Sequence, residues 1–287
     1  MIREEKTGML YLCATPIGNL EDVTLRVLRI LKEADVVAAE DTRQSIKLLN
    51  HYEIKTPLVS YHEHNKYEKT PVLVQRMLKG ETIALVTDAG TPAISDPGED
   101  LVRACYEAGI PVTSLPGPAA VITALTLSGM PARRFTFEGF LPVDKKERKE
   151  VLDCLAQTTC TTIFYEAPHR LKKTLALFCE LLGENNRIAI CKELTKKHET
   201  ALHFTLGEAV AYYEANEPKG EFVLVLEGKN AEDMNRAKQE KWQEMPLSKH
   251  MKIYEDKGLS RKEAMKAVAK DRGVSKREIY AKLLEDE

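Results

Sequence analysis

The feature that most constrains the fold is a regular alternation of short apolar runs with amphipathic stretches, from about residue 9 to residue 227. The apolar runs have the length and the β-branched content of buried strands, whereas the longer stretches repeat their apolar residues at helical spacing. Strands that alternate with helices predict parallel pairing, because a crossover helix returns the chain to the same end of the sheet. The sequence therefore predicts an α/β protein.

The first half of this pattern predicts a mostly parallel sheet with helices on both faces. We expect strands at 9–14, 36–39, 58–60, 82–87 and 112–115. Between them we expect helices at 24–34 and 42–50, a third capped by Thr70 with Pro71 in its first turn, and a fourth that Pro97 opens and Gly109 closes. These elements form a predicted N-terminal α/β domain over 9–116.

A second series of elements begins near Gly117 with a predicted helix over 117–130. It continues with strands at 135–138, 161–165, 187–192 and 221–227, helices at 145–156, 169–182 and 208–214, and a hairpin-like threonine-rich stretch up to residue 205. Its later strands are joined by links too short for crossover helices, so we expect a mixed sheet. These elements form a predicted C-terminal α/β domain over 117–228.

The end of the chain predicts a separate basic helical module over 246–287. Residues 229–245 are polar without an apolar stripe, and we interpret them as a linker. A helix at 248–256 and two capping boxes, Ser260 to Glu263 and Ser275 to Glu278, give a pattern like a helix-turn-helix. Eleven Lys and Arg against five Asp and Glu give residues 245–283 a charge of +6, although the whole chain carries −2. A local positive charge of this size suits a polyanionic partner.

Several classes of protein do not fit the composition. The six cysteines form no C-x-x-C pair and no zinc spacing with histidine, so we expect them to be reduced and predict no metal site, the string Tyr61-His-Glu-His64 included. No apolar stretch reaches about 18 residues, and the first residues do not resemble a secretory signal. We therefore expect no membrane association and a cytoplasmic location.

Three loops rich in proline and glycine follow predicted strands, at 15–19, 88–98 and 115–120. Ligands of open α/β sheets bind where loops leave the carboxyl ends of strands, and glycine there lets backbone approach a ligand. The chain has no G-x-x-x-x-G-K-[ST], no G-x-G-x-x-G after a strand and no G-x-S-x-G. These absences disfavour a P-loop enzyme, a dinucleotide or Rossmann-type methyltransferase fold and an α/β-hydrolase.

These loops belong to a series of strings that resembles the ribosomal RNA small subunit methyltransferase I family, in the tetrapyrrole-methylase-like superfamily. The match runs from about residue 9 to 228, and seven strings carry it: YLCATPIGNLEDVTLR (11–26), AEDTR (39–43), TDAGTP (87–92), SDPG (95–98), LPGPAA (115–120), FYEAPHR (164–170) and KGEFV (219–223). The resemblance implies two α/β domains of the class III methyltransferase fold, with S-adenosylmethionine between them. It also implies 2′-O-methylation of a cytidine in the decoding region of small-subunit (16S) rRNA, on naked RNA or the assembled subunit, and a homodimer. The basic tail resembles the extra helical module of this family.

The resemblance also implies roles for particular residues. Donor contacts fall on Asp88, Thr91, Ala119, Ala120, Tyr165, Gly220 and Glu221. Methyl transfer to a ribose hydroxyl also needs a group that accepts the hydroxyl proton. Glu166 and Asp41 are the candidates, since both follow predicted strands, but each could equally pair with a nearby arginine, Arg170 or Arg43. RNA phosphate contacts are expected at Arg26, Arg43, Lys276, Arg277 and Lys282.

Two other readings of the sequence stay open at this point. An enzyme of the same fold could methylate a tetrapyrrole or a protein side chain, although a small macrocycle needs no basic helical module. A non-enzyme of another class could sense a ligand between the domains and bind nucleic acid through the helix-turn-helix. Transfer of a methyl group from S-adenosylmethionine to RNA would distinguish the function that we favour from both alternatives.

Overall fold

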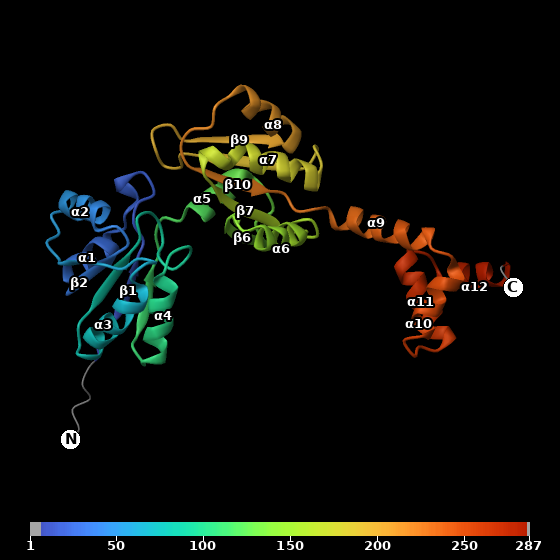
Figure 1. Ribbon diagram of the computed structural model, residues 1–287, viewed down its shortest axis with the longest axis horizontal. Coiled ribbons are helices and arrows are strands. Elements are labelled where there is room, and N and C mark those ends of the chain that lie inside the picture. Colours follow the sequence, from blue (N-terminus) through green and yellow to red (C-terminus); the bar gives the residue numbers. More distant parts are fainter. Residues whose placement is uncertain (1–6, 286–287) are drawn as a thin grey trace, which may run out of the picture. The chain divides into compact units, whose positions relative to one another are not determined.

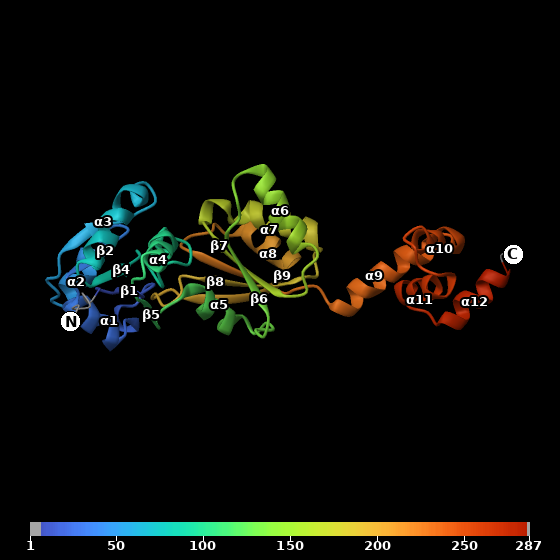
Figure 2. The same ribbon diagram turned by 90° about the horizontal axis from the view of Figure 1, so that it is seen from below.

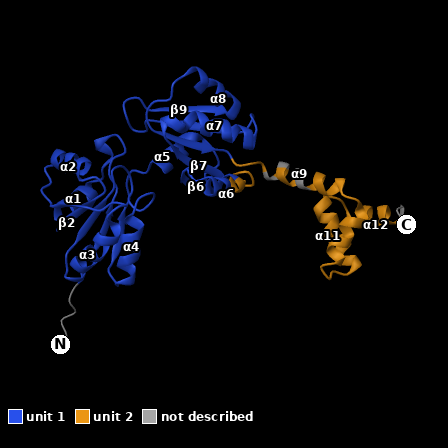
Figure 3. Cartoon of the chain, viewed as in Figure 1, with its two compact units in different colours: residues 1–152, 161–227 blue, residues 153–160, 228–287 orange. Residues whose placement is uncertain are grey.

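The structure is a computed structural model that describes residues 7–285 (Figure 1). The chain divides into two units, one formed by the residues up to 152 together with 161–227, and one formed by 153–160 together with the residues from 228 onward (Figure 3). The first unit contains two sheets, and the second is helical. Among the described residues, no helix has the length and apolar character to cross a bilayer.

The first sheet is entirely parallel, where the sequence predicts a mostly parallel one. Its strands are β1 (Leu10–Cys13), β2 (Val36–Ala39), β3 (Leu58–Ser60), β4 (Ile83–Val86) and β5 (Val112–Leu115), in the order β3-β2-β4-β1-β5. A short 3-10 turn (Leu20–Asp22) precedes α1 (Leu25–Glu33) and α2 (Thr42–His51), which bury their apolar faces on one side of the sheet. The helices α3 (Lys66–Leu78) and α4 (Gly98–Glu107) cover the other side. The predicted helices on both faces are therefore confirmed.

The second sheet is mixed, with the order β6-β7-β10-β8-β9. Its elements are α5 (Ala120–Ser128), β6 (Phe135–Phe140), α6 (Lys145–Leu155), β7 (Thr161–Glu166), α7 (Pro168–Leu182), β8 (Arg187–Lys192), β9 (Thr200–Thr205), α8 (Leu206–Ala215) and β10 (Phe222–Leu226). Only β6 and β7 pair in parallel, so the mixed sheet is confirmed. The helix α5 packs on one face, and Figure 2 shows α7 and α8 on the opposite side.

Two helix starts differ from those that the sequence predicts. The third helix begins at Lys66, four residues before Thr70, and Pro71 lies inside it. Thr70 is no cap, because its hydroxyl is hydrogen-bonded to the buried hydroxyl of Tyr61. The helix expected from residue 117 begins at Ala120, and Ala119 before it is extended. Pro118 explains why Gly117 is not helical, because proline disfavours helical backbone in the residue that precedes it.

The second unit consists of α9 (Ala231–Glu244), α10 (Leu247–Glu255), α11 (Arg261–Arg272) and α12 (Lys276–Glu285). Both predicted capping boxes are present, at Ser260 and at Ser275. The segment that we interpreted as a linker is the helix α9. Its Trp242 stacks on the buried ring of His250 at 4.1 Å, and Gln243 donates a hydrogen bond to the carbonyl of Arg272. Tertiary contacts thus hold a helix for which the sequence shows no apolar stripe.

Candidate functional site

A cavity of about 460 Å³ lies within the first unit, where the loops after the first sheet meet the second sheet. The first-sheet loops contribute Ile17 and most of the segment from Thr87 to Asp96. The start of α5 contributes Ala119 and Ala120. The strands of the second sheet and the segments next to them contribute the remaining lining residues, Phe140, Tyr165, Glu166, Ala167, Pro168, Leu194, Glu221, Phe222 and Val223. Its volume and its mixed lining suit a small organic ligand.

Hydrogen bonds join the three loops that the sequence singled out. The backbones of Thr15 and Gly90 exchange two bonds, at 2.8 and 3.0 Å, and the Thr15 hydroxyl donates to the Thr87 carbonyl at 3.1 Å. The Thr91 hydroxyl donates to the Pro118 carbonyl at 2.9 Å. The three loops, which are far apart in the sequence, therefore lie together at the cavity.

The second loop is held in a strained conformation by its own carboxylate. Asp96 accepts hydrogen bonds from the backbone of Ala93 at 2.9 Å and of Gly98 at 2.8 Å. Ala93 has a φ of +65°, which is costly for a residue with a side chain. Strain of this kind persists only where surrounding contacts fix it, and it is common next to ligand sites.

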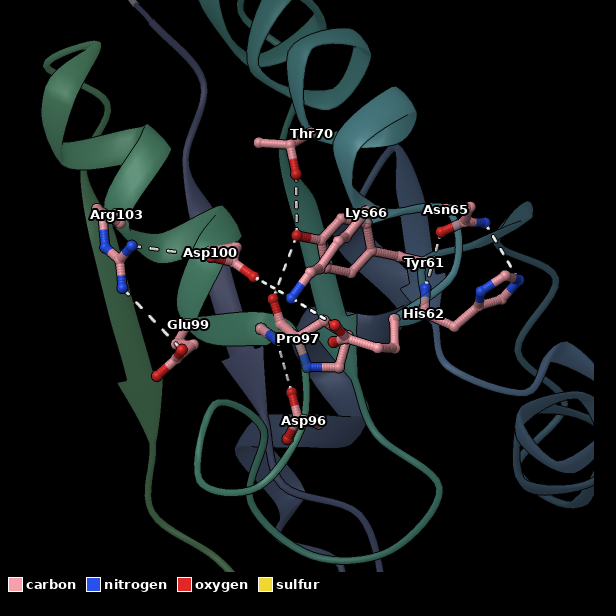
Figure 4. Close-up of polar contacts among 12 residues, drawn as sticks. Tyr61, His62, Asn65, Lys66, Thr70, Asp96, Pro97, Glu99, Asp100 and Arg103 are labelled. Atoms are coloured by element: carbon pink, nitrogen blue, oxygen red, sulfur yellow. Dashed lines mark hydrogen bonds and ion pairs between the residues drawn. The ribbon is translucent and has the colours of Figure 1, made fainter. Parts of the chain in front are cut away.

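A buried polar network anchors the same loop from behind (Figure 4). The hydroxyl of Tyr61, which is 1% exposed, donates to the Pro97 carbonyl at 3.2 Å and is hydrogen-bonded to Thr70 at 2.9 Å. Nearby, the ammonium of Lys66 lies 2.8 Å from Asp100 at the start of α4, which raises the pKa of Lys66. The network therefore ties the loop to α3 and α4 and presents its residues 91–96 to the cavity.

The opposite wall contains an ionic turn that the sequence analysis did not identify. The carboxylate of Glu193 accepts from the backbone of Glu221 at 2.9 Å and from Lys196 at 3.0 Å, and Lys196 also binds the Glu221 carboxylate at 2.8 Å. These donors, the Glu221 backbone first, lower the pKa of Glu193. Glu193 has a φ of +52°, a second strained position beside the cavity. A Cβ on Gly18 would lie 2.4 Å from the Lys196 side chain, so the first loop packs directly on this turn.

Tyr165 forms the aromatic floor of the cavity. It lines the cavity together with Ala119 and Ala120, and all three pack on the buried core that includes Val121 of α5. Burial raises the pKa of its phenol. Phe137 and Phe140 contact the ring edge-on, with centroids 4.8 and 5.8 Å away.

Glu166 borders the cavity, but its side chain is fully buried. One carboxylate oxygen accepts from the backbone of Ala167 at 2.8 Å, and the other accepts from the Thr174 hydroxyl at 2.5 Å. The Arg170 guanidinium lies 3.6 Å from the first oxygen. All of these partners belong to the start of α7 or the turn before it, so the carboxylate holds that turn together.

Asp41 caps α2 and is bound by Arg43, with contacts of 2.8 and 3.0 Å between the two side chains. These hydrogen bonds lower the pKa of Asp41 to about 2. The backbone of Asp41 donates to the Asp88 carboxylate at 2.9 Å. Partial burial, together with the neighbouring Glu40 and Asp41, raises the pKa of Asp88. The ends of β2 and β4 thus bring Asp41 and Asp88 close together, next to the cavity-lining residues Thr87 and Ala89.

The residues expected to bind the donor converge on this region. Five of them line the cavity directly: Thr91, Ala119, Ala120, Tyr165 and Glu221. Asp88 and Gly220 are sequence neighbours of lining residues. Arg26 and Arg43 are exposed on the first unit, and the exposed Lys276, Arg277 and Lys282 belong to the second unit.

Sequence reasoning missed several lining residues, among them Ile17, Ile94, Phe140 and Leu194. Apolar side chains outside the predicted strands and helices were the available signal, as at Ile17, Ile94 and Phe140. In the structure, Ile94 and Phe140 are 43% and 54% exposed. Within the described part of the chain, no group of His, Cys, Asp and Glu side chains could hold a metal ion.

Comparisons with known proteins agree with this geometry. The family model of tetrapyrrole (corrin/porphyrin) methylases matches residues 9–210. A ribosomal RNA small subunit methyltransferase I from Halalkalibacterium halodurans is 52% identical over 278 residues, 97% of this chain and 95% of that protein. The protein of the same name from Bacillus subtilis is 48% identical over 273 residues, 95% and 93% of the two chains.

Solved structures share the fold at low identity. A diphthine synthase superposes with a TM-score of 0.62 at 14% identity, covering 78% of this chain and 91% of that one. A uroporphyrin-III C-methyltransferase from Thermus thermophilus, complexed with S-adenosyl homocysteine, superposes with a TM-score of 0.53 at 19% identity, covering 77% and 92%.

Proposed function

This chain belongs to the tetrapyrrole methylase family, among the ribosomal RNA small subunit methyltransferases I, and we propose that it transfers a methyl group from S-adenosylmethionine to small-subunit ribosomal RNA. The acceptor is the 2′-hydroxyl of a cytidine in the decoding region. The observation that carries the proposal is the convergence of the three family loops on one cavity, joined by the bonds of Thr15 to Gly90 and of Thr91 to Pro118.

The cavity fits the donor in size and in chemistry. Its volume of about 460 Å³ accommodates a nucleoside with an amino-acid tail. Ala119 and Ala120 leave the backbone at the start of α5 accessible, and Tyr165 offers an aromatic surface to a purine ring. Glu221, whose carboxylate is bound by Lys196, contributes to the edge of the cavity.

The protein's own contribution to the reaction is mainly positioning. When bound, S-adenosylmethionine supplies a methyl group activated by its sulfonium centre. The strained loop at Ala93 and the ionic turn at Glu193 fix opposite walls of the cavity, so that a ribose hydroxyl can be held in line with that methyl group. Of the two carboxylates that the sequence offers as proton acceptors, Asp41 is bound by Arg43 and Glu166 by Thr174 and Ala167. We therefore assign Glu166 a positioning role at the start of α7.

The RNA is bound by basic residues of both units. Arg26 and Arg43 are exposed on the first unit, and Lys276, Arg277 and Lys282 are exposed on α12. Phosphate contacts from these side chains give affinity that falls with salt. The proposal includes a homodimer, because exposed apolar residues such as Ile122 and Leu127 on α5 are suited to cover by a second copy. It also includes a cytoplasmic location, which follows from the proposed ribosomal RNA substrate.

The experiment that tests this function offers the purified protein labelled S-adenosylmethionine and three acceptors. These are 16S rRNA free of protein, small subunits that lack the modification, and a uroporphyrinogen. We expect label in RNA alone, at a cytidine ribose, with the two RNA forms differing in rate. Label in the macrocycle, or donor binding without transfer to any RNA, would contradict the proposal.

A further inference from the structure

An irregularity in β6 turns one phenylalanine toward the cavity. Along the parallel pair, Phe137 lies opposite Ile163, but the register then slips by one residue, so that Phe140 lies opposite Tyr165. Successive side chains of a regular strand point to opposite faces, and Phe137 and Phe140 would then face opposite ways. The bulge restores Phe140 to the face of Tyr165, and it depends on Gly139, whose φ of +63° suits glycine.

Phe140 is nonetheless not part of the core. It is 54% exposed, although it lines the cavity and touches the Tyr165 ring edge. The backbone that follows it is fixed by two arginines: Arg170 donates to the carbonyl of Leu141, and Arg148 donates to the carbonyl of Val143 at 3.1 Å. The bulge before it and these contacts after it hold an exposed aromatic ring in place at the mouth of the cavity.

We propose that Phe140 is the surface on which the base of the target nucleotide stacks. Single-stranded RNA is recognised by stacking of unpaired bases on aromatic side chains, beside positive charges that attract the phosphates. The exposed ring of Phe140 provides the stacking surface, and the guanidinium group of Arg148, hydrogen-bonded to the nearby Val143 carbonyl, adds a positive charge. This inference rests on the proposed RNA methylation and names the residue that binds the acceptor base.

The position of Phe140 separates it from the donor subsite. Tyr165 is the inner ring, and like Ala119 and Ala120 it packs on the buried core that includes Val121 of α5. Phe140 lies on its outer side, and the neighbouring Gly139 faces Ser95 of the second loop, 3.9 Å from where a Cβ would be. A base stacked on Phe140 therefore enters from the solvent side, with its ribose directed toward the donor.

The test compares Phe140→Ala, Phe140→Leu and Phe140→Trp with the parent on unmodified small subunits. Phe135→Ala is the matched control, because Phe135 lies on the same strand, is 39% exposed and is outside the cavity lining. We expect kcat/KM for RNA to fall roughly 5- to 100-fold in the Ala variant, which is the usual loss for one stacked base. The Leu variant should fall nearly as far, whereas the Trp and Phe135→Ala variants should stay close to the parent. Calorimetry should show unchanged donor affinity in all four.

Three results would overturn the inference. Full activity of Phe140→Leu would indicate a general apolar contact. A loss of donor affinity equal to the loss of kcat/KM would place Phe140 in the donor site. An unimpaired Phe140→Ala would remove its role altogether. A parent that methylates no RNA would refute the proposed function itself, and the stacking with it, so the two failures are distinguishable.

Discussion

Replacing Glu166 with glutamine separates the two roles that a carboxylate at this position can have. The side chain is fully buried, and its oxygens are taken by Ala167, Thr174 and Arg170. Glutamine keeps the size of the side chain but loses its charge. Its NH2 group also replaces a carboxylate oxygen, so that one of these donors faces another donor and loses its hydrogen-bond acceptor. Losing a charge-assisted network of this kind in a buried position costs about 2–3 kcal/mol. For a unit of this size, such a loss lowers the melting temperature by about 4–12 °C.

The assay is thermal unfolding together with steady-state methylation of small subunits. If Glu166 holds the turn at the start of α7, Glu166→Gln should have a lower melting temperature, while its kcat should fall less than about tenfold. Loss of a general base would lower kcat by more, because such a base contributes roughly 100-fold or more. Thr174→Val is the matched control, because it removes one partner of the carboxylate and should give a similar loss of stability. An unchanged melting temperature with kcat reduced by more than about 100-fold would instead make Glu166 the proton acceptor.

Three further predictions concern the donor, the pH and the helical unit. Asp88→Ala should weaken donor binding at least about tenfold by calorimetry, because Asp88 organises the strand ends behind the cavity; equal affinity would refute its assignment. Burial lowers the pKa of His250 below about 6.5, and its ring accepts a hydrogen bond from Arg272, so the neutral form is favoured in the folded state. The helical unit should therefore be more stable above about pH 6.5 than at acidic pH, where protonation of His250 opposes folding. Fluorescence of Trp242, the one tryptophan of the sequence, follows unfolding at each pH, and His250→Phe should flatten this dependence. Deleting 246–287 should raise KM for RNA and reduce its salt dependence at constant donor affinity, and an unchanged KM would argue against RNA binding by this segment.

Local periodicity in the sequence was sufficient to predict most strands and helices of the first unit. The strands at 36–39, 58–60, 112–115 and 187–192 have the predicted bounds, because short runs rich in apolar and β-branched residues mark them in the sequence. The prediction failed where distant partners decide. Pro71 is tolerated inside α3, whose preceding turn is anchored through Thr70 and Tyr61. The helix α9 has too few apolar residues to be seen from its own sequence.

The sequence by itself determined most strand and helix segments, the three loops rich in proline and glycine, the capping boxes and the family, because each depends on residues within one short segment. Only the tertiary structure decided which carboxylates are already bound, since the partners of Glu166 and Asp88 depend on backbone geometry and packing. It also decided the direction of Phe140. A one-residue bulge moves that side chain to the other face of the sheet, and no apolar pattern records such a slip.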